Sequence, residues 1–320
     1  MREERNIRRR NRQINRRKQA RKRLFLFAGT AVLFMLLLNI INLNIRLKEL
    51  KSEWQSIEIR RSQITGSDVQ VQGAVRVGSS GDLKVGKPVE RTEAEVLQRL
   101  EELGQDDSVI EQICHNAARY PKELLAVLAN NPEMADFVAG YPGENKGSAG
   151  GLTASEIEED FPLFLQWDPR WGYQDYGKKN CIGLAGCGPT CMSMVLFYLT
   201  RDESLTPDKV AEYSMKNGYY VEGSGTAWTL FEDIPKLYDI QVTNLSFSEK
   251  DMKAVLDKGA IIACVMGRGD FTLSGHFIVI YGYDSGGFMV NDPNCIARSS
   301  KRWTFRELER QVRNIWAYEK

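Results

Sequence analysis

The chain has 320 residues, of which 42% are hydrophobic and 27% are charged, so it holds enough apolar side chains for a packed core and is not a disordered chain. Its formal net charge of +1 hides an uneven distribution, because residues 1–23 carry 12 Lys and Arg against two acids. Such a tail suits nucleic acid or anionic lipid, and the segment that follows it decides between the two.

Residues 24–45, LFLFAGTAVLFMLLLNIINLNI, contain no formal charge. As a helix this segment would be about 33 Å long, which is enough to cross the hydrocarbon core of a membrane. It is longer than the apolar part of a signal peptide, and no small-residue cleavage site follows it. The basic residues lie on one flank only, so we expect a single-pass anchor in the cell membrane, with the N-terminus cytoplasmic and residues 46–320 extracellular. The tail then contacts anionic lipid, and no nucleic-acid partner is expected.

Residues 46–65 carry a short heptad pattern of apolar side chains, which predicts a helical stalk. A pattern of this length is compatible with pairing of two chains into a homodimer and with a solvated single helix, and both alternatives stay open. Residues 66–90 are rich in Gly, Ser and Val without a helical period, which indicates a linker.

Residues 91–142 predict a small module of three or four short helices. Thr92 and Glu95 have the spacing of a capping box, and leucines follow at helical intervals. The Asn-Asn-Pro sequence at residues 130–132 interrupts the helical pattern. A second linker is expected at residues 143–160, which begin with the Gly-rich sequence GENKGSAGG.

The sequence changes character from residue 161 onward. Apolar patterns predict helices first and then short strands separated by Gly-rich turns. Three helices are expected: one that begins after Cys187, one over residues 206–217 and one over residues 228–238. The expected strands are residues 260–266, 276–283 and 288–292. Helices followed by antiparallel strands indicate an α+β domain over residues 161–320.

Cys187 lies in the sequence GLAGCGPTCMSMVLFYL, directly before an apolar helix. Pro189 suits the first turn of that helix, so Cys187 is expected near its N-terminus, where the helix dipole stabilises a thiolate. Gly186 and Gly188 would leave room for a substrate backbone. A buried structural thiol is the alternative, because most free cysteines behave as small apolar side chains.

A cysteine nucleophile needs a base and a group that orients the base. The chain has two histidines: His115 in the helical module and His276 at the start of the strand GHFIVIYGYD. Asp292 ends the next strand, and the turn at residues 284–287 would make the two strands antiparallel. Asp292 would then lie beside His276 and hold its second ring nitrogen. His115 is expected to be a helix-surface or packing residue.

An acyl-transfer site also needs a donor for the oxyanion. Gln166 follows an apolar, strand-like run in FPLFLQWDPRWG, and its side-chain amide would serve. Gln174 is a second candidate, and a plain surface amide is the alternative reading of Gln166.

The sequences LQWDPRWG, AGCGPTCMSMVL, GRGDFTLSGHFIVIYGYD and NDP together resemble the papain-like family-39 cysteine peptidases, and in particular their stand-alone bacteriocin-peptidase-like relatives in Gram-positive bacteria. This resemblance covers about half of the chain. It implies a papain-like fold with helices packed on an antiparallel sheet, and a catalytic set of Cys187, His276, Asp292 and Gln166.

Two features depart from the transporter-linked members of that family. Their Gln lies a few residues before the nucleophile, whereas 21 positions separate Gln166 from Cys187. The chain also lacks the Gly-x-x-x-x-Gly-Lys-Ser/Thr sequence of an attached nucleotide-binding domain. The leader-peptide substrate of those members is therefore not carried over to this chain.

The remaining sequence patterns predict neither an adhesion signal nor a metal or cofactor site. The Arg-Gly-Asp triplet at residues 268–270 is expected to be a turn and not an adhesion signal. Bridges between Cys181 and Cys191 or between Cys181 and Cys295 stay open. No metal and no organic cofactor is expected, because the cysteines and histidines lack zinc-site spacing.

The sequence thus predicts a membrane-anchored extracytoplasmic cysteine peptidase of unknown substrate. The alternatives are an inactive papain-fold module that binds peptide or cell-wall material, and a scaffold built on the stalk and helical module. The expected parts are a basic cytoplasmic tail (1–23), a transmembrane helix (24–45), a helical stalk (46–65), a linker (66–90), a small helical module (91–142), a second linker (143–160) and the peptidase domain (161–320).

Overall fold

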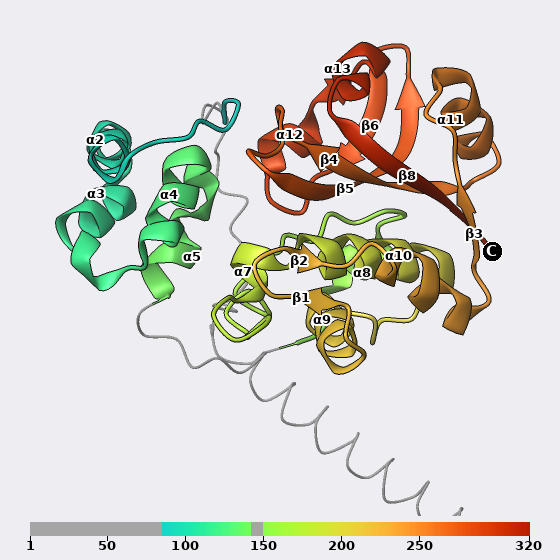
Figure 1. Ribbon diagram of the computed structural model, residues 1–320, viewed down its shortest axis with the longest axis horizontal. Coiled ribbons are helices and arrows are strands. Elements are labelled where there is room, and N and C mark those ends of the chain that lie inside the picture. The colour runs from blue at the N-terminus through green and yellow to red at the C-terminus, as the bar shows by residue number, and fades with distance from the viewer. Residues whose placement is uncertain (1–84, 142–149) are drawn as a thin grey trace, which may run out of the picture. The chain divides into compact units, whose positions relative to one another are not determined.

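The computed structural model describes residues 85–141 and 150–320 (Figure 1). The expected tail at 1–23, membrane helix at 24–45 and stalk at 46–65 lie outside the described residues, as does most of the first linker. Within the described ranges, none of the helices combines the length and apolar character that a membrane crossing requires. We call residues 85–141 the helical module and residues 150–320 the C-terminal domain.

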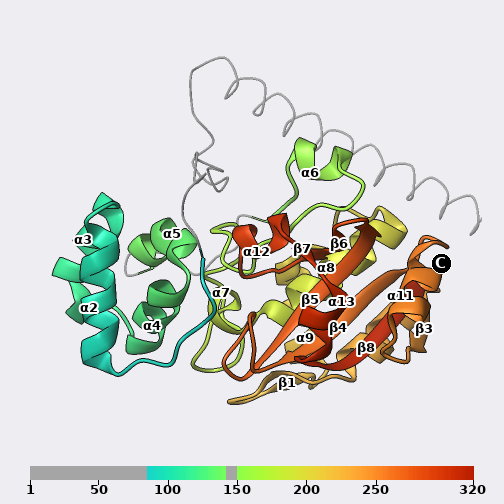
Figure 2. The same cartoon turned by 90° about the horizontal axis from the view of Figure 1, so that it is seen from above.

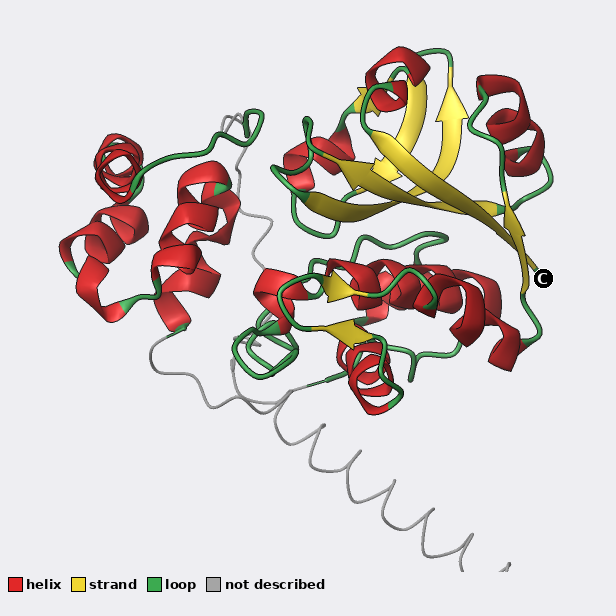
Figure 3. Cartoon of the chain, in the orientation of Figure 1, coloured by secondary structure: helices red, strands yellow, loops and turns green. Residues whose placement is uncertain are grey.

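Among the described residues, the regular elements of the helical module are helices only, and all strands belong to the C-terminal domain (Figure 3). Its α-helices are α2 (Glu93–Gly104), α3 (Ser108–His115), α4 (Lys122–Asn130) and α5 (Ala135–Gly140), with the 3-10 helices η1 (Ala117–Arg119) and η2 (Pro132–Met134) between them. Thr92 caps α2 and Glu95 returns the contact to the Thr92 backbone, which confirms the predicted capping box. The predicted break at residues 130–132 ends α4, where Asn131 caps η2.

The C-terminal domain places its helices mainly before its sheet. The helices are α6 (Ala154–Glu158), α7 (Ile182–Ala185), α8 (Cys187–Thr200), α9 (Pro207–Lys216), α10 (Leu230–Asp233), η3 (Ile234–Tyr238), α11 (Glu249–Leu256), α12 (Ile296–Ser300) and α13 (Phe305–Glu309). The strands are β1 (Tyr220–Val221), β2 (Gly225–Thr226), β3 (Gln241–Asn244), β4 (Ile261–Gly267), β5 (Gly275–Asp284), β6 (Gly287–Asn291), β7 (Arg302–Trp303) and β8 (Val312–Glu319). The predicted mixed helical and antiparallel architecture is therefore present.

Six strands form one antiparallel sheet in the order β3-β8-β4-β5-β6-β7. The turn between β5 and β6 makes these two strands antiparallel neighbours, as the sequence predicts. Strand β8 was not predicted, yet it lies in the sheet between β3 and β4, near the C-terminal end of the chain. The short β1–β2 hairpin stands apart from this sheet.

Both faces of the sheet are covered, so its central strand β4 is buried along its whole length. Ile261, Ala263 and Val265 point to the core shared with α8 and α9, whereas Ile262 and Cys264 point to the core shared with α11 and α13. This alternation is the two-residue period of a strand, and burial on both faces makes the strand apolar throughout. Helices α8, α9 and α10 lie on one side of the sheet, and α11 and α13 lie on the other (Figures 1 and 2).

The helical module and the C-terminal domain share a hydrophobic core. Phe137 of α5 stacks on Tyr173 with ring centroids 4.6 Å apart, and the Tyr173 hydroxyl donates to the Phe137 carbonyl at 3.0 Å. A Cβ at Gly183 would clash with the Phe137 ring, so only glycine fits there. Leu165 and Trp167 of the C-terminal domain join the same core, and the module is therefore packed against this domain.

Part of the predicted linker at 143–160 is ordered as α6. Thr153 and Glu156 form a capping box, although its pattern was not recognised in the sequence. Arg170 binds Glu156 and Asp168 at 2.7 Å each, and all three side chains are largely buried. Residues 143–149 of that linker lie outside the described residues, as does residue 142, the last residue of the predicted module.

Phe137→Ala is expected to lower the free energy of unfolding by about 3–5 kcal/mol, because it removes a buried ring from the shared core and leaves a cavity. Urea unfolding followed by circular dichroism measures the change. Leu97→Ala, at a position that is 38% exposed on α2, is the control and should change the free energy by about 0.5 kcal/mol or less. Equal stability of the two variants would contradict a core that joins the module to the C-terminal domain.

Candidate active site

Cys187 is the first residue of α8, with Gly186 as its N-cap, which confirms its predicted place at a helix N-terminus. Its side chain is partly exposed, whereas every residue from Gly188 to Phe197 is buried. The flanking glycines have a reason other than the expected room for substrate. A Cβ at Gly188 would clash with Thr226, and one at Gly186 would press on Ile182, so packing alone requires both.

His276 is the second residue of β5 and is 7% exposed. Its Nε2 lies 2.7 Å from Oδ1 of Asp292, which directly follows β6. Because Nε2 is engaged by Asp292, Nδ1 is the ring nitrogen that remains for the hydrogen bond to Cys187. The structure thus brings together the three residues that the sequence pattern singled out.

Asp292 is completely buried and is held by several groups. Nε of Arg298 donates to its Oδ2 at 2.6 Å, and the backbone N–H of Asn294 donates to its Oδ1 at 2.8 Å. The backbone N–H of Asp292 itself donates to the Ser299 hydroxyl at 2.9 Å. A buried carboxylate with a charged partner and this many donors stays ionised and fixed in place.

The charges of this cluster shift the pKa values of its members. Burial of the His276 imidazole would lower its pKa, but the charge and hydrogen bond of Asp292, together with Cys187, outweigh burial and raise it to about 9. Burial would raise the pKa of Asp292, but the charges of Arg298 and His276 and their hydrogen bonds lower it to about 2. His276 is therefore a cation and Asp292 an anion over the neutral range.

Gln166 lies at the same site, although the run before it forms no strand. Its backbone N–H donates to the Pro293 carbonyl at 2.7 Å, which ties it to the segment after Asp292. Its side-chain Nε2 donates to the Gly183 carbonyl at 2.9 Å, while its Oε1 is buried without a hydrogen-bond partner. An amide nitrogen carries two hydrogens, so one N–H remains for a further acceptor.

Cys187, His276 and Gln166 line one cavity of about 310 Å³ together with Asn294 and Arg298. Gln174, the second candidate for the oxyanion donor, does not line this cavity. His115 is exposed at the end of α3, as expected for a helix-surface residue.

The second cysteine of the motif, Cys191, is fully buried in the core behind Cys187. Burial raises the pKa of its thiol well above the usual range, which leaves it protonated and unreactive. Cys191 and Cys295 are both free thiols, so neither bridge that the sequence left open, Cys181–Cys191 or Cys181–Cys295, is formed. In the described part of the chain, no group of three or more His, Cys, Asp or Glu side chains is arranged to hold a metal ion.

Arg298 and Asn294 are site residues that sequence reasoning missed. Arg298 follows Asp292 by six positions in NDPNCIAR, with no motif of its own to mark it. It reaches Asp292 because α12 turns the chain back directly after β6. A signal existed only in the chemistry: a buried Asp beside a His requires a further cation or donors.

A partly exposed cysteine at a helix N-terminus, an imidazole paired to a buried carboxylate and a nearby amide are the groups that nucleophilic catalysis by cysteine requires. The model of the Peptidase_C39 like family matches residues 158–320, and the chain belongs to this family. At the level of the family, this indicates a hydrolase of the cysteine-peptidase type.

The solved structures that are similar to this chain include two peptidases. The peptidase domain of Streptococcus ComA, a bi-functional ABC transporter involved in a quorum-sensing pathway, is 14% identical over 42% of this chain and 89% of its own, with a TM-score of 0.32. A C39-like peptidase from Bacillus anthracis is 15% identical over 53% of this chain and 98% of its own, with a TM-score of 0.35. No curated protein sequence matches the chain.

Arg298→Met is expected to lower the free energy of unfolding by about 3 kcal/mol or more, because Oδ2 of the buried Asp292 loses its charged partner. Urea unfolding measures the loss. Arg302→Met, which removes an ion pair to Asp284 that is about 40% exposed, is the matched control and should cost about 1 kcal/mol or less. Similar losses in both variants would contradict the assignment of Arg298 as the group that holds Asp292.

The pair of His276 and Asp292 also predicts how stability depends on pH. The pKa of His276 rises from 6.5 to about 9 on folding, so its contribution is complete below 6.5 and is lost as the pH rises through 9. The pKa of Asp292 falls from 3.8 to about 2, so its contribution is lost only as the pH falls toward 2. The stability difference between wild type and His276→Gln is measured by urea unfolding from about pH 2 to above pH 9. It should be largest between pH 3.8 and 6.5, where both contributions are complete. A difference that grows above pH 9 would contradict the ion pair.

Proposed function

We propose that this protein is a membrane-anchored, extracytoplasmic cysteine peptidase that hydrolyses a peptide or amide bond. The proposal is carried by one observation: a partly exposed cysteine begins α8 beside an imidazole that bonds a buried, arginine-held carboxylate. Family membership supports the reaction class. The charge-free segment at 24–45 and the basic tail before it support the anchor and its orientation.

In the proposed reaction, His276 holds the proton of the Cys187 thiol, and the thiolate attacks the substrate carbonyl carbon. The remaining N–H of Gln166 and the backbone N–H of Cys187 stabilise the oxyanion. His276 then protonates the leaving nitrogen, the C–N bond breaks and an acyl-enzyme thioester forms. His276 next takes a proton from water as the water attacks the thioester, the C–S bond breaks, and the acid leaves with the Cys187 thiolate and protonated His276 restored.

Asp292 and Arg298 touch neither the substrate nor the reacting atoms in this proposal. Asp292 fixes the orientation of His276 and stabilises its imidazolium form, and Arg298 keeps Asp292 ionised and in place. We describe them as positioning residues. No cofactor takes part in the proposed steps.

Alkylation by iodoacetamide, mapped to each cysteine by mass spectrometry, tests the nucleophile. At about pH 5.5 Cys187 should react at least about tenfold faster than Cys114, a partly buried cysteine of the helical module that serves as an internal control. His276→Ala should remove this difference. Equal reactivity of Cys187 and Cys114 in the wild type would contradict a thiolate–imidazolium pair.

Hydrolysis is then tested with a library of peptides derived from a whole proteome. The full-length wild type, in detergent, should generate new peptide termini, and Cys187→Ala should generate none. If Cys187 is activated but no peptide is cut, the alternative of a papain-fold module that binds peptide or cell-wall material becomes the better interpretation. If the Cys187→Ala variant retains full function in cells, the better interpretation is a scaffold built on the stalk and the helical module.

A further inference from the structure

The cavity beside Cys187 and His276 has walls from two parts of the chain. One wall belongs to the C-terminal domain and includes Leu184, Phe271 and Leu273 in addition to the proposed catalytic groups. The other wall belongs to the helical module and consists of Pro88 with Ala126, Val127, Asn130 and Asn131. Residues 126–130 belong to α4, so this helix faces the proposed nucleophile across a space of about 310 Å³.

Polar contacts hold the end of α4 against the C-terminal domain. Nδ2 of Asn131 donates to the Asn294 carbonyl at 2.5 Å, only two residues beyond Asp292. The Glu133 carboxylate accepts from the backbone N–H groups of Ile296 and Ala297 at 2.7 and 2.9 Å. With the shared core around Phe137, these bonds make the module a fixed wall of the cavity.

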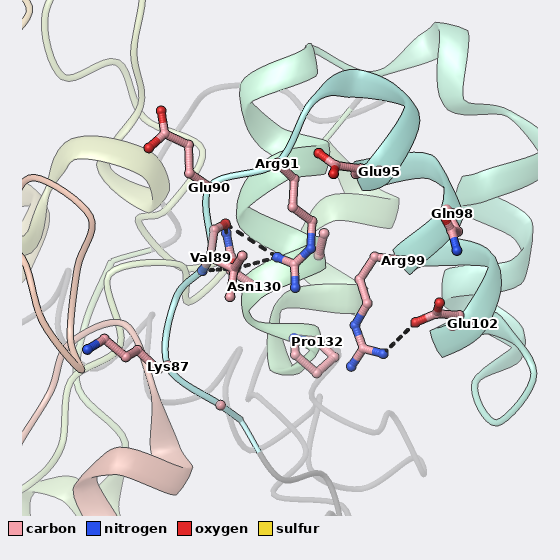
Figure 4. A pocket seen from close by; sticks show the side chains of 12 residues that line it. Lys87, Val89, Glu90, Arg91, Glu95, Gln98, Arg99, Glu102, Asn130 and Pro132 are labelled. Atoms are coloured by element: carbon pink, nitrogen blue, oxygen red, sulfur yellow. Dashed lines mark hydrogen bonds and ion pairs between the residues drawn. The ribbon is translucent and has the colours of Figure 1, made fainter.

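The segment that carries Pro88 is held in the same way. The side-chain amide of Asn130 pairs with both backbone groups of Val89, at 2.9 and 3.1 Å, and its oxygen also accepts from Arg91 at 2.7 Å (Figure 4). On the other side of the segment, Glu90 pairs with Arg268 of the C-terminal domain at 3.2 Å. Pro88, which lines the cavity, is therefore followed directly by two anchored residues, Val89 and Glu90.

The side chains that line the cavity indicate which kind of substrate side chain it can accept. Apolar side chains come from both walls: Pro88, Ala126 and Val127 from the module, and Leu184, Phe271 and Leu273 from the C-terminal domain. Uncharged polar side chains, among them Asn130, Asn131, Gln166, Thr272 and Ser274, complete most of the remaining lining. Among the described residues that line it, none is acidic, and the one guanidinium, Arg298, already pairs with Asp292. A cationic substrate side chain would find no partner there, whereas an apolar side chain would bury its surface on both walls.

We propose that the helical module is part of the substrate-binding cleft, and that Val127, Ala126 and Pro88 contact an uncharged, apolar side chain of the peptide beside the scissile bond. This proposal rests on the peptidase function proposed above. It assigns the module a direct part in substrate selection. The module would have this part even though it lies outside the segment, residues 158–320, that the family model matches.

Two probes with the same reactive group measure the room beside Cys187: iodoacetamide, and its larger N-phenyl derivative iodoacetanilide. The rates are taken on the full-length protein at about pH 9, where an ordinary thiol is largely ionised, so the rate ratio does not require an activated cysteine. Val127→Trp should lower the ratio of the iodoacetanilide to the iodoacetamide rate at Cys187 by about fivefold or more, because the indole fills the cavity. Val127→Ala should raise this ratio.

Gln112→Trp is the matched control, since it adds the same side chain to an exposed position of α3, a helix that contributes no residue to the cavity, and it should leave the ratio unchanged. If Val127→Trp does not retain the wild-type circular dichroism spectrum, Ala126→Leu replaces it and should lower the ratio in the same direction. A ratio that stays at the wild-type value in the folded variant overturns the proposal. Failure of the proposed function is recognised separately, by the absence of fast Cys187 alkylation at about pH 5.5.

Discussion

The hydrogen bond between His276 and Asp292 is the interaction on which the site depends. Both side chains are buried, and a buried charge is costly unless it is paired and hydrogen-bonded. The fold meets this requirement with Arg298 and with the backbone of Asn294. The result is a fixed chain of charges that runs from Arg298 through Asp292 to His276 and ends beside Cys187.

The two layers of the C-terminal domain bring the two halves of this site together. The helical layer contributes Cys187 at the start of α8, and the sheet contributes His276 from β5. Alternating side chains of β4 and β5 pack against α8, so the shared core fixes the helix relative to the sheet. The segment around Gln166 closes the arrangement, because it bonds to Pro293 on the sheet side and to Gly183 just before α8.

The helical module changes how the domain is understood. The C-terminal domain by itself contains all of the proposed reacting groups, yet α4 and Pro88 of the module line the cavity next to them. The module shares a hydrophobic core with the domain through Phe137 and bonds its backbone through Asn131 and Glu133. Such contacts are those of a structural component and not of a loosely tethered neighbour.

Local signals in the sequence determined several features by themselves. The capping box at Thr92, the helix that begins at Cys187 and the antiparallel pair of β5 and β6 follow from short-range patterns. The same patterns placed His276 and Asp292 side by side, because a tight turn fixes which residues of two strands meet. The need for an oxyanion donor singled out Gln166, which the family resemblance also implied; Gln166 lines the same cavity, while its role as oxyanion donor stays a prediction.

Only the tertiary structure decided the rest. Strand β8 enters the sheet between β3 and β4, Arg298 turns back onto Asp292, and α4 faces Cys187 from about 60 residues earlier in the chain. The glycines around Cys187 likewise owe their presence to Ile182 and Thr226, which no local pattern connects to them. These features depend on contacts between segments far apart in sequence, and such contacts are selected by packing and by the pairing of buried charges, which leave no periodic signal in the chain.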